Sequence, residues 1–344
     1  MRYQRQITLK EWGAGAQEKL ARSRVLVIGA GGLGCPALQY LCAAGVGTLG
    51  IVDGDRVSLP DLHRQILFGE GDIGAEKATT AASRLAHLSP SSKCIPYPMR
   101  LHPGNALDIV DSYDVILDAS DNFPTRYLLS DACALLNKPL VYGSVSRFEG
   151  QVGVYLPGGP QYRDIFPNAG EVPSCAEAGV LGVVAGIIGN LQALEVLKII
   201  SGVGQPLAGR LLTYQALTNQ FYEVEIAPPA ETRVLTREAF QGGPYTEVID
   251  PETFNGMLRD PEILVLDIRE TGEEPQVPFP HVRRPLSLLR GEPVPYTGRR
   301  IAVFCRSGQR SLEAAALLGT ENTVYALEGG ILGWLAFQNQ PDVR

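Results

Sequence analysis

Two loops in this chain of 344 residues combine residue types that can do chemistry. The first is a glycine loop that directly follows an apolar run at 24–28 and contains Gly29, Gly31, Gly32 and Gly34. Glycines let a phosphate group approach backbone N–H groups at the start of a helix. The second loop follows an apolar run at 301–304 and reads Cys305, Arg306, Ser307, Gly308, Gln309, Arg310 and Ser311. Its backbone N–H groups can form an anion-binding nest, and its two arginines favour a thiolate or persulfide at the cysteine.

The residues after the glycine loop indicate which nucleotide chemistry it serves. Asp53 ends the next apolar run, about 20 residues on, where an acid can accept hydrogen bonds from ribose hydroxyls. On these features alone, an NAD-dependent dehydrogenase would be the default prediction. Arg64, Lys77 and Asp121 then change it. Hydride transfer needs few cations, whereas phosphoryl or adenylyl transfer needs Arg and Lys to neutralise a triphosphate and a carboxylate to hold magnesium.

Taken together and in this order, these motifs resemble those of the MoeB/ThiF adenylyltransferases, which are relatives of ubiquitin-activating enzymes. The matching positions are Arg5, Gln6, the glycine loop, Asp53, Asp55, Arg64, Gln65, Lys77, Asp121 and Asn122. The resemblance implies that these residues bind ATP, with Asp53 on the ribose and the catalytic Arg64 and Lys77 on the phosphates. It also implies that the catalytic Asp121 organises magnesium, and that Arg5 reaches the partner subunit's ATP site in a homodimer.

The sequence departs from the family pattern at three places. Asp61 stands where the family commonly has Asn, and His63 stands where it has Gln. A negative charge at Asp61 is unfavourable near a triphosphate unless it meets magnesium or Arg64. Both C-x-x-C pairs of the family's structural zinc site are missing, with Gln161 and Asp164 at the place of the first pair. We therefore expect no zinc in this domain.

Cys175 is a second candidate for sulfur chemistry. It lies near the end of a Gly- and Pro-containing stretch at 157–176, just before an expected helix. A thiol near a helix N-terminus has a stabilised thiolate and can act as a nucleophile. Cys175 also matches the loop cysteine of the MoeB/ThiF family. Four further cysteines lie among apolar residues and fit buried positions: Cys35, Cys42, Cys94 and Cys133.

The segment around the Cys305 loop resembles a rhodanese, a class that carries sulfane sulfur as a cysteine persulfide. On the loop alone, a phosphatase-like site is the competing interpretation, since it also uses a cysteine, a nest and an arginine. The surrounding motifs favour the rhodanese: Asp267-Ile-Arg269-Glu270, His281 and Glu328-Gly-Gly-Ile331 with Trp334. The stretch from His281 to Gly298 departs from the common pattern, which leaves the sulfur donor open.

Alternating apolar runs and helical segments must position these loops. Strands are expected at 24–28, 49–53, 113–118, 139–144 and 151–156, with helices between most of them. This alternation predicts an α/β protein with a parallel, doubly wound, Rossmann-like domain over 1–226. Pro and Gly residues mark a linker at 227–246, and a small α/β rhodanese domain is expected over 247–344.

Composition excludes several classes of protein. With 45% apolar and 19% charged residues, the chain can bury a core. It has 30 basic and 37 acidic residues, a net charge of −7, and so lacks the basic excess of a nucleic-acid-binding protein. Its start has no signal-peptide pattern, and the apolar run at 179–189 fits a buried helix better than a membrane span. We expect a cytoplasmic protein with no nucleic-acid or membrane partner.

The fusion of an adenylating domain with a persulfide carrier predicts an enzyme that makes a thiocarboxylate. By resemblance, ATP and magnesium convert the C-terminal Gly-Gly of a ubiquitin-like sulfur-carrier protein into carrier-AMP. The Cys305 persulfide then attacks the acyl carbon, and Cys175 releases the thiocarboxylate. Two alternatives stay open: conjugation through a Cys175 thioester without sulfur transfer, and a non-catalytic scaffold that binds the carrier. The pathway, such as molybdopterin or thiamine biosynthesis, and the sulfane-sulfur donor are also open.

Overall fold

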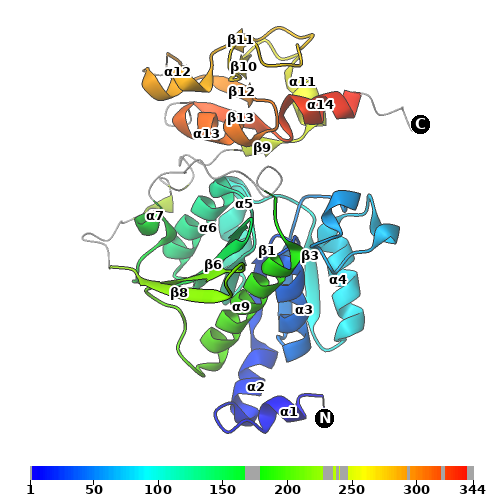
Figure 1. Cartoon of the computed structure of the whole chain (residues 1–344), viewed down its shortest axis with the longest axis vertical. Helices are drawn as coiled ribbons and strands as arrows, with labels where there is room; N and C mark the ends of the chain where they lie inside the picture. Colours follow the sequence, from blue (N-terminus) through cyan, green and yellow to red (C-terminus); the bar gives the residue numbers. More distant parts are fainter. Residues whose placement is uncertain are drawn as a thin grey trace. The chain divides into compact units, whose positions relative to one another are not determined.

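The chain folds into two compact units, Met1–Phe240 and Gln241–Arg344. The computed structural model describes residues 2–166, 179–227, 235–237, 240, 247–292, 295–318 and 322–338. Most of the linker expected at 227–246 lies outside these residues, so its limits stay a prediction. Each unit is built on its own sheet (Figure 1).

The first unit contains an eight-stranded sheet in the order β3-β2-β1-β4-β5-β6-β7-β8. The first five strands in this order are parallel: β3 (Lys93–Tyr97), β2 (Thr48–Val52), β1 (Arg24–Ile28), β4 (Val115–Asp118) and β5 (Leu140–Ser146). The remaining strands are antiparallel: β6 (Glu149–Tyr155), β7 (Arg210–Gln215) and β8 (Gln220–Glu225). The order in which strands are added reverses at β1, because β2 and β3 lie on one side of it and β4 and β5 on the other. Open α/β sheets bind ligands at such a point, at the carboxyl ends of the strands.

Helices pack against this sheet and close its core. The long ones are α2 (Gly13–Arg22), α3 (Gly34–Ala44), α4 (Lys77–Leu88), α5 (Pro103–Asp111), α6 (Phe123–Leu136) and α9 (Gly182–Ser201). Short helices are α1 (Gln4–Ile7), η1 (Leu59–Asp61), η2 (Glu70–Asp72) and α7 (Tyr162–Ile165). Helix α3 packs against α4 and α9, and α5 packs against α6. The predicted Rossmann-like α/β class is confirmed.

Helix α9 begins at Gly182 and so contains most of the apolar run at 179–189 that the sequence assigns to a buried helix. Among the described residues, it is the one helix whose length and composition would also suit a membrane span. Val184, Ala185 and Ile188 are buried in the core of the first unit. The buried Glu195 carboxylate accepts hydrogen bonds from the Lys198 ammonium at 2.6 Å and from the Leu207 amide at 2.8 Å. The buried carboxylate of α9 is therefore paired inside the protein.

The second unit is a five-stranded parallel sheet in the order β11-β10-β12-β13-β9. Its strands are β9 (Glu247–Ile249), β10 (Ile263–Asp267), β11 (Val282–Arg283), β12 (Arg300–Phe304) and β13 (Thr323–Leu327). Its helices are α11 (Pro251–Met257), α12 (Leu286–Gly291), α13 (Gln309–Leu318) and α14 (Gly330–Gln338). Helices α12 and α13 share one core cluster and α11 and α14 another, so the sheet is covered on two faces.

Candidate functional site

The glycine loop joins β1 to α3 at the point where the strand order of the sheet reverses. Gly29 has a φ of +94°, and a Cβ at this position would lie 2.7 Å from the backbone oxygen of Ala119. Only glycine therefore permits the close approach of this loop to the segment after β4. The turn brings the N-terminus of α3 to the carboxyl edge of the sheet, where its backbone N–H groups can bind an anion.

The structure brings Arg64 and Gln65 to this loop, as the sequence motif requires. A Cβ on Gly32 would contact the Arg64 side chain at 3.4 Å, and one on Gly31 would lie 3.9 Å from the Gln65 amide nitrogen. Gln65 is buried, and its Oε1 has no hydrogen-bond partner within the described part of the chain. Both side chains are therefore placed to contact a group bound over the glycines.

Asp53 directly follows β2 and lies beside the glycine loop. Its carboxylate accepts hydrogen bonds from the backbone amides of Ala30, at 2.7 Å, and Asp55, at 2.8 Å. Burial raises the pKa of Asp53 to about 6, the negative charge of Asp55 adds to this rise, and Lys77 opposes it. Asp53 thus ties the glycine loop to the end of β2 and titrates close to neutral pH.

Lys77 is the buried cation of the site. It begins α4, and its Nζ lies 3.3 Å from the Asp61 carboxylate and 3.6 Å from that of Asp55. Burial alone would lower the pKa of Lys77, but the carboxylates of Asp53, Asp55 and Asp61 outweigh burial and raise it. The ammonium is therefore charged at neutral pH.

Asp61, which departs from the family pattern, is paired with two cations and a hydroxyl group. The Arg64 guanidinium donates to it at 2.7 Å, the Ser58 hydroxyl donates at 2.8 Å, and Lys77 lies on its other side. Burial would raise the pKa of Asp61, but these partners lower it. The charge at Asp61 thus meets Arg64, one of the two conditions under which it is tolerated near a triphosphate. His63 lies 3.0 Å from Arg64 through its Nε2.

Asp121 and Asn122 lie on the loop after β4, at the same sheet edge. The Asp121 side chain is exposed, and its hard carboxylate oxygens are of the kind that magnesium prefers. Asn122 caps α6, because its Oδ1 accepts a hydrogen bond from the Thr125 amide at 3.0 Å. The loop therefore presents one carboxylate to solvent at the sheet edge where the predicted nucleotide residues lie.

Two buried residues behind this loop were not found from the sequence. Asp118 ends β4 and accepts hydrogen bonds from the Ser120 amide and hydroxyl, and burial raises its pKa. Arg126 in α6 is buried against the Tyr142 ring, and its Nε has no partner within the described residues. The signal for both is an acid at a strand end followed, eight residues later, by an arginine in the first turns of the next helix.

Arg5 lies on the opposite side of the unit from the glycine loop. Its neighbour Gln6 donates a hydrogen bond to the carbonyl of Ala44 at 3.0 Å, at the far end of α3. Helix α3 is about 16 Å long from its start at the glycine loop. Figure 1 shows α1 at that remote edge. Arg5 is therefore placed away from the ATP residues predicted in its own chain.

The residues at the place of the missing zinc ligands contact each other instead. The backbone amide of Gln161 donates a hydrogen bond to the Asp164 carboxylate at 2.7 Å, so this carboxylate caps the start of α7. A carboxylate used as a helix cap, beside an amide side chain, does not fit a structural zinc site. Within the described residues, no group of three or more His, Cys, Asp or Glu could hold a metal. The absence of zinc stays a prediction, and Cys175 lies outside the described residues.

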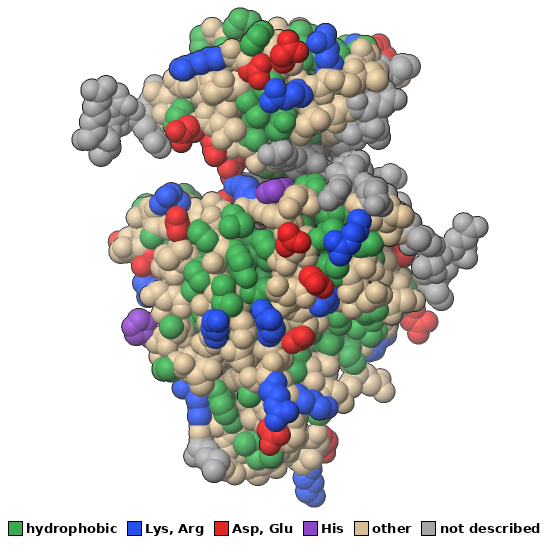
Figure 2. Space-filling view, turned by 180° about the vertical axis from the view of Figure 1, so that it is seen from behind, with side chains coloured by type: hydrophobic (Ala, Val, Ile, Leu, Met, Phe, Trp, Pro, Cys, Tyr) green, Lys and Arg blue, Asp and Glu red, His purple; other side chains and the backbone are tan. Residues whose placement is uncertain are grey.

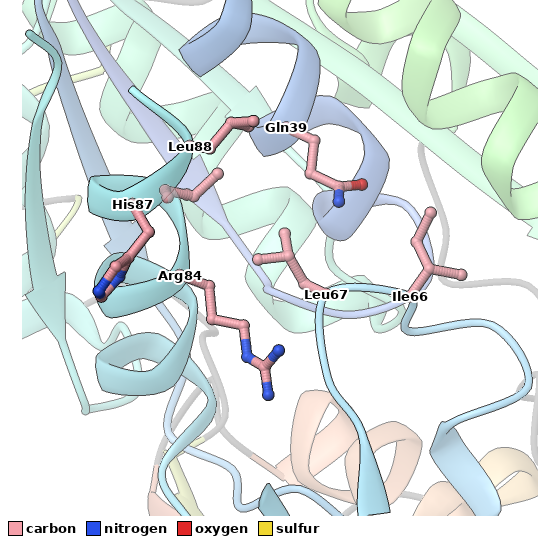
Figure 3. Close-up of a pocket in the computed structure, with 7 residues that line it drawn as sticks. Gln39, Ile66, Leu67, Arg84, His87 and Leu88 are labelled. Atoms are coloured by element: carbon pink, nitrogen blue, oxygen red, sulfur yellow. The ribbon is translucent and has the colours of Figure 1, made fainter. Parts of the chain in front are cut away.

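A pocket of about 400 Å³ lies elsewhere on the first unit (Figure 3). Its lining includes Gln39 of α3, Ile66 and Leu67 of the segment between η1 and η2, and Arg84 and His87 of α4. The predicted nucleotide residues do not line it. We therefore keep the glycine loop as the candidate nucleotide site.

The Cys305 loop is fixed by the start of α14. Cys305 follows β12 and is buried, and the Gly308 amide donates to its Sγ at 3.1 Å. The amide of Ile331 donates to the Cys305 carbonyl at 2.9 Å, and a Cβ on Gly330 would lie 2.6 Å from that carbonyl. The Gly-Gly-Ile motif is thus needed to seat the loop, and the backbone N–H group at the sulfur favours a thiolate.

A buried charge cluster supports the loop from the neighbouring strand. Asp267 ends β10 and lies opposite Phe304, the residue before Cys305. Arg269 is completely buried and donates to both Asp267 oxygens, at 2.9 and 2.8 Å, and Arg283 adds a bond at 2.7 Å. Burial would raise the pKa of Asp267, but the two arginines lower it. His281 lies 3.8 Å from the same carboxylate.

The two arginines of the loop differ in their surroundings. Arg306 is exposed, whereas Arg310 donates from both terminal nitrogens to the carboxylate of Glu273, at 2.5 and 2.6 Å. Ser311 is buried and its Oγ has no partner in the described part of the chain, and Ser307 is exposed. Gln309 begins α13. The predicted persulfide loop therefore comprises the connection 305–308 between β12 and α13 and the first three residues of α13.

Comparison with known proteins shows which family and which relatives the chain resembles. The model of the ThiF family matches residues 3–235. A sulfur carrier protein adenylyltransferase of Thermus thermophilus is 48% identical over 74% of this chain and 96% of its own length. A probable adenylyltransferase/sulfurtransferase, MoeZ, of Mycobacterium tuberculosis is 37% identical over 99% of this chain and 94% of its own. The adenylyltransferase and sulfurtransferase MOCS3 of Bos taurus is 40% identical over 97% and 85%.

Solved structures agree on the fold. Escherichia coli MccB with ATP matches with a TM-score of 0.60 and 21% identity, over 67% of this chain and 72% of that one. At this identity the likeness supports the architecture of the first unit and nothing further. The MoeB/ThiF resemblance is confirmed by the family model and by relatives that extend over almost the whole chain. The chain belongs to the ThiF family.

Proposed function

We propose that this protein adenylates the C-terminal glycine of a ubiquitin-like sulfur-carrier protein and then converts it to a thiocarboxylate with sulfur carried on Cys305. The observation that carries the proposal is the presence in one chain of two different sites. One is a glycine loop flanked by Arg64 and the buried Lys77, and the other is a cysteine whose sulfur accepts a hydrogen bond from its own loop. Relatives that match nearly the whole chain carry both activities in their names.

In the adenylation step, the first site holds ATP. The glycine loop and the start of α3 bind phosphate oxygens, and Asp53 accepts hydrogen bonds from the ribose. Arg64 and Lys77 neutralise the charge that develops on the triphosphate, and Asp121 would hold the magnesium that accompanies ATP. A glycine carboxylate oxygen of the carrier attacks the α-phosphorus, and pyrophosphate leaves. The acyl-adenylate makes AMP a good leaving group.

In the sulfur step, the outer sulfur of the Cys305 persulfide attacks the acyl carbon and expels AMP. The product is an acyl disulfide between the carrier and Cys305. The Cys175 thiolate then attacks the Cys305 sulfur, so that the carrier leaves as a thiocarboxylate and a Cys175–Cys305 disulfide remains. A thiol reductant restores both cysteines. The Gly308 amide, 3.1 Å from the Cys305 sulfur, supports the anionic forms that this sequence needs.

The two alternatives lose their supporting features. Conjugation through a Cys175 thioester would not need the Cys305 loop, yet the Ile331 amide and the Gly330 backbone hold that loop in position. A non-catalytic scaffold would be favoured by a charge at Asp61 that repels a triphosphate. That charge is paired with Arg64 and Lys77.

The surface of the first unit supports a homodimer without a nucleic-acid partner. Apolar side chains reach the surface of the first unit (Figure 2), and three on the edge strand β8 are about half exposed, namely Phe221, Tyr222 and Val224. An apolar edge strand is typical of an interface, which supports the homodimer. Lys and Arg are dispersed on the face in Figure 2, in keeping with the expectation of no nucleic-acid partner. A cytoplasmic location stays a prediction.

The proposal is tested by the intact mass of a Gly-Gly-ended carrier after incubation with the full-length protein, ATP, magnesium and a sulfane-sulfur donor. We expect the carrier to gain the mass of one oxygen replaced by one sulfur. With Cys305→Ala, we expect pyrophosphate release to continue without sulfur gain. Sulfur gain in that variant would contradict the proposal, and pyrophosphate release with an unchanged carrier in the wild type would favour conjugation.

The pH dependence of ATP binding tests the role of Asp53. Because its pKa is raised to about 6, Asp53 is ionised at pH 7.5 and becomes protonated below pH 6, where it is a poorer acceptor for ribose hydroxyls. We expect the Kd of ATP to rise about tenfold between pH 7 and pH 5. Isothermal titration with a non-hydrolysable ATP analogue measures this. Asp53→Asn should bind more weakly with a flatter pH profile, and an equally steep profile in that variant would exclude Asp53 as the cause.

Asp61→Asn tests whether this carboxylate competes with ATP. The Asp61 carboxylate lies 2.7 Å from the Arg64 guanidinium and 3.3 Å from the Lys77 ammonium. Removal of its charge frees both cations for the triphosphate, so we expect the Kd of the same analogue to fall about fivefold. Asp72→Asn, which removes the partner of Arg84 in the same unit, is the control and should leave the Kd unchanged. Weaker binding by Asp61→Asn would show that Asp61 positions the cations instead.

A further inference from the structure

The Cys305 loop holds less positive charge than its two arginines indicate. Both terminal nitrogens of Arg310 bind the two oxygens of Glu273, at 2.5 and 2.6 Å, across 37 residues of sequence. Glu273 is fixed further, because its Oε1 accepts a hydrogen bond from the Glu270 amide at 2.8 Å. Arg310 lowers the pKa of Glu273 to about 2, so the carboxylate is ionised throughout the neutral range. One arginine of the loop is thus neutralised.

This ion pair lies at the Cys305 loop, because Arg310 is in the first turn of α13, two residues after the Gly308 amide that donates to the Cys305 sulfur. The hydrogen bonds and charge of Glu273 are the main cause that raises the pKa of Arg310, and Cys305 and Glu270 add to the rise. The pair is partly exposed, with 34% of the Arg310 side chain and 24% of the Glu273 side chain accessible to solvent. A sulfur donor that approaches Cys305 therefore meets a carboxylate as well as a thiolate. A donor with oxyanion groups finds the terminal nitrogens of Arg310 already bound.

We propose that Glu273 is a specificity-determining residue that makes the Cys305 loop select an uncharged sulfane-sulfur donor, the protonated persulfide of a thiol, over dianionic thiosulfate. The inference rests on the proposed sulfur-carrying role of Cys305. Glu273 acts through Arg310 and through its own charge, so it is a positioning residue. The same argument disfavours phosphate monoesters, which are also dianions, and so separates the loop from a phosphatase-like site.

The two donors place different charges beside Glu273. With a persulfide RSSH, the Cys305 thiolate attacks the outer sulfur, a Cys305–S–SH persulfide forms, the donor S–S bond breaks and RS⁻ leaves. With thiosulfate, the same attack breaks the bond between the two sulfurs and sulfite leaves as a dianion. Both steps balance without an oxidant or a reductant. The thiosulfate step gathers three negative charges at a loop that already contains a carboxylate, whereas the persulfide step gathers one.

Donor preference in the full-length protein tests the inference. Cys305 is loaded either with thiosulfate or with the persulfide of 2-mercaptoethanol, which has no other charged group, and the rate of sulfur gain is followed by intact mass after alkylation. We expect Glu273→Gln to raise the rate constant per donor concentration for thiosulfate about tenfold, through tighter donor binding, and to leave the persulfide rate within about twofold. Glu273→Asp keeps the charge and should keep the wild-type preference.

The matched control removes a different carboxylate paired with an arginine. Asp260→Asn frees Arg300 from a 3.0 Å ion pair at the start of β12, about 16 Å from the strand end that carries Cys305. It should leave both rates unchanged, and circular dichroism confirms the fold of each variant. A parallel fall of both rates in Glu273→Gln would show a purely structural role, and an unchanged ratio would show no role in selection. Either result overturns the inference.

Failure of the inference is distinguishable from failure of the proposed function. The donor experiment measures sulfur on Cys305 and needs no carrier or ATP. If Glu273→Gln changes the preference while the carrier gains no sulfur, the proposed function is wrong and the inference stands. If the carrier gains sulfur through Cys305 but the preference does not change, only the inference is wrong.

Discussion

Replacement of Lys77 by methionine is expected to lower carrier-dependent pyrophosphate release by about a hundredfold to a thousandfold. Lys77 is buried at the start of α4, and its pKa is raised by three carboxylates, so it brings a permanent charge to the glycine loop site. A charge held in a buried site stabilises a developing phosphate charge more strongly than an exposed one does. Methionine is one atom shorter than lysine, keeps an unbranched side chain and removes the ammonium group with its charge.

Pyrophosphate release is measured with a coupled phosphate assay at saturating carrier. Lys138, which follows α6, provides the matched control. Its Nζ lies 3.8 Å from the Asp111 carboxylate, and Lys138→Met should retain full activity. Lys77→Arg, which keeps the charge with a different shape, should recover part of the rate. A Lys77→Met protein that is folded and releases pyrophosphate at the wild-type rate would remove Lys77 from the proposed machinery.

The parts of the first site that could be predicted from the sequence are those held by local spacing. Gly29 follows a buried strand directly, and Asp61 and Arg64 are three residues apart, so their contact is a matter of one turn. Strand β3 escapes prediction for the opposite reason. It is an edge strand that contains Pro96 and has no fully buried residue, so its sequence shows no apolar run.

In the second unit, the sequence identifies the reactive loop but not its electrostatic environment. The Cys305 loop is recognisable because its residues are consecutive. The partner of Arg310 is 37 residues away and lies among several acidic residues, of which any could have been chosen. Only the fold of β10 beside β12 selects Glu273. Sheet topology determines long-range pairs of this kind. A motif can indicate which residues matter, but it does not show which of them form a pair.

Asp267→Asn is expected to destabilise the second unit by about 3–5 kcal/mol, because it removes the charge that compensates a buried arginine. Arg269 has no exposed surface and binds both Asp267 oxygens, and Arg283 binds one of them. For a unit of this size, such a loss lowers the unfolding temperature by about 15 °C. Differential scanning calorimetry of the full chain measures the shift, and pyrophosphate release by the first unit should persist.

Two further variants separate the buried charge from the loss of one ion pair in general. Glu292→Gln removes the partner of Arg284 at an exposed 2.7 Å ion pair and should cost less than about 1 kcal/mol. The double variant Asp267→Leu/Arg269→Met removes both buried charges, so it should recover part of the stability that Asp267→Asn loses. If the double variant is less stable than the single one, the cluster stabilises the unit through its hydrogen bonds, including the bond from Arg269 to the Pro275 carbonyl at 2.6 Å, and charge compensation is not the main cause.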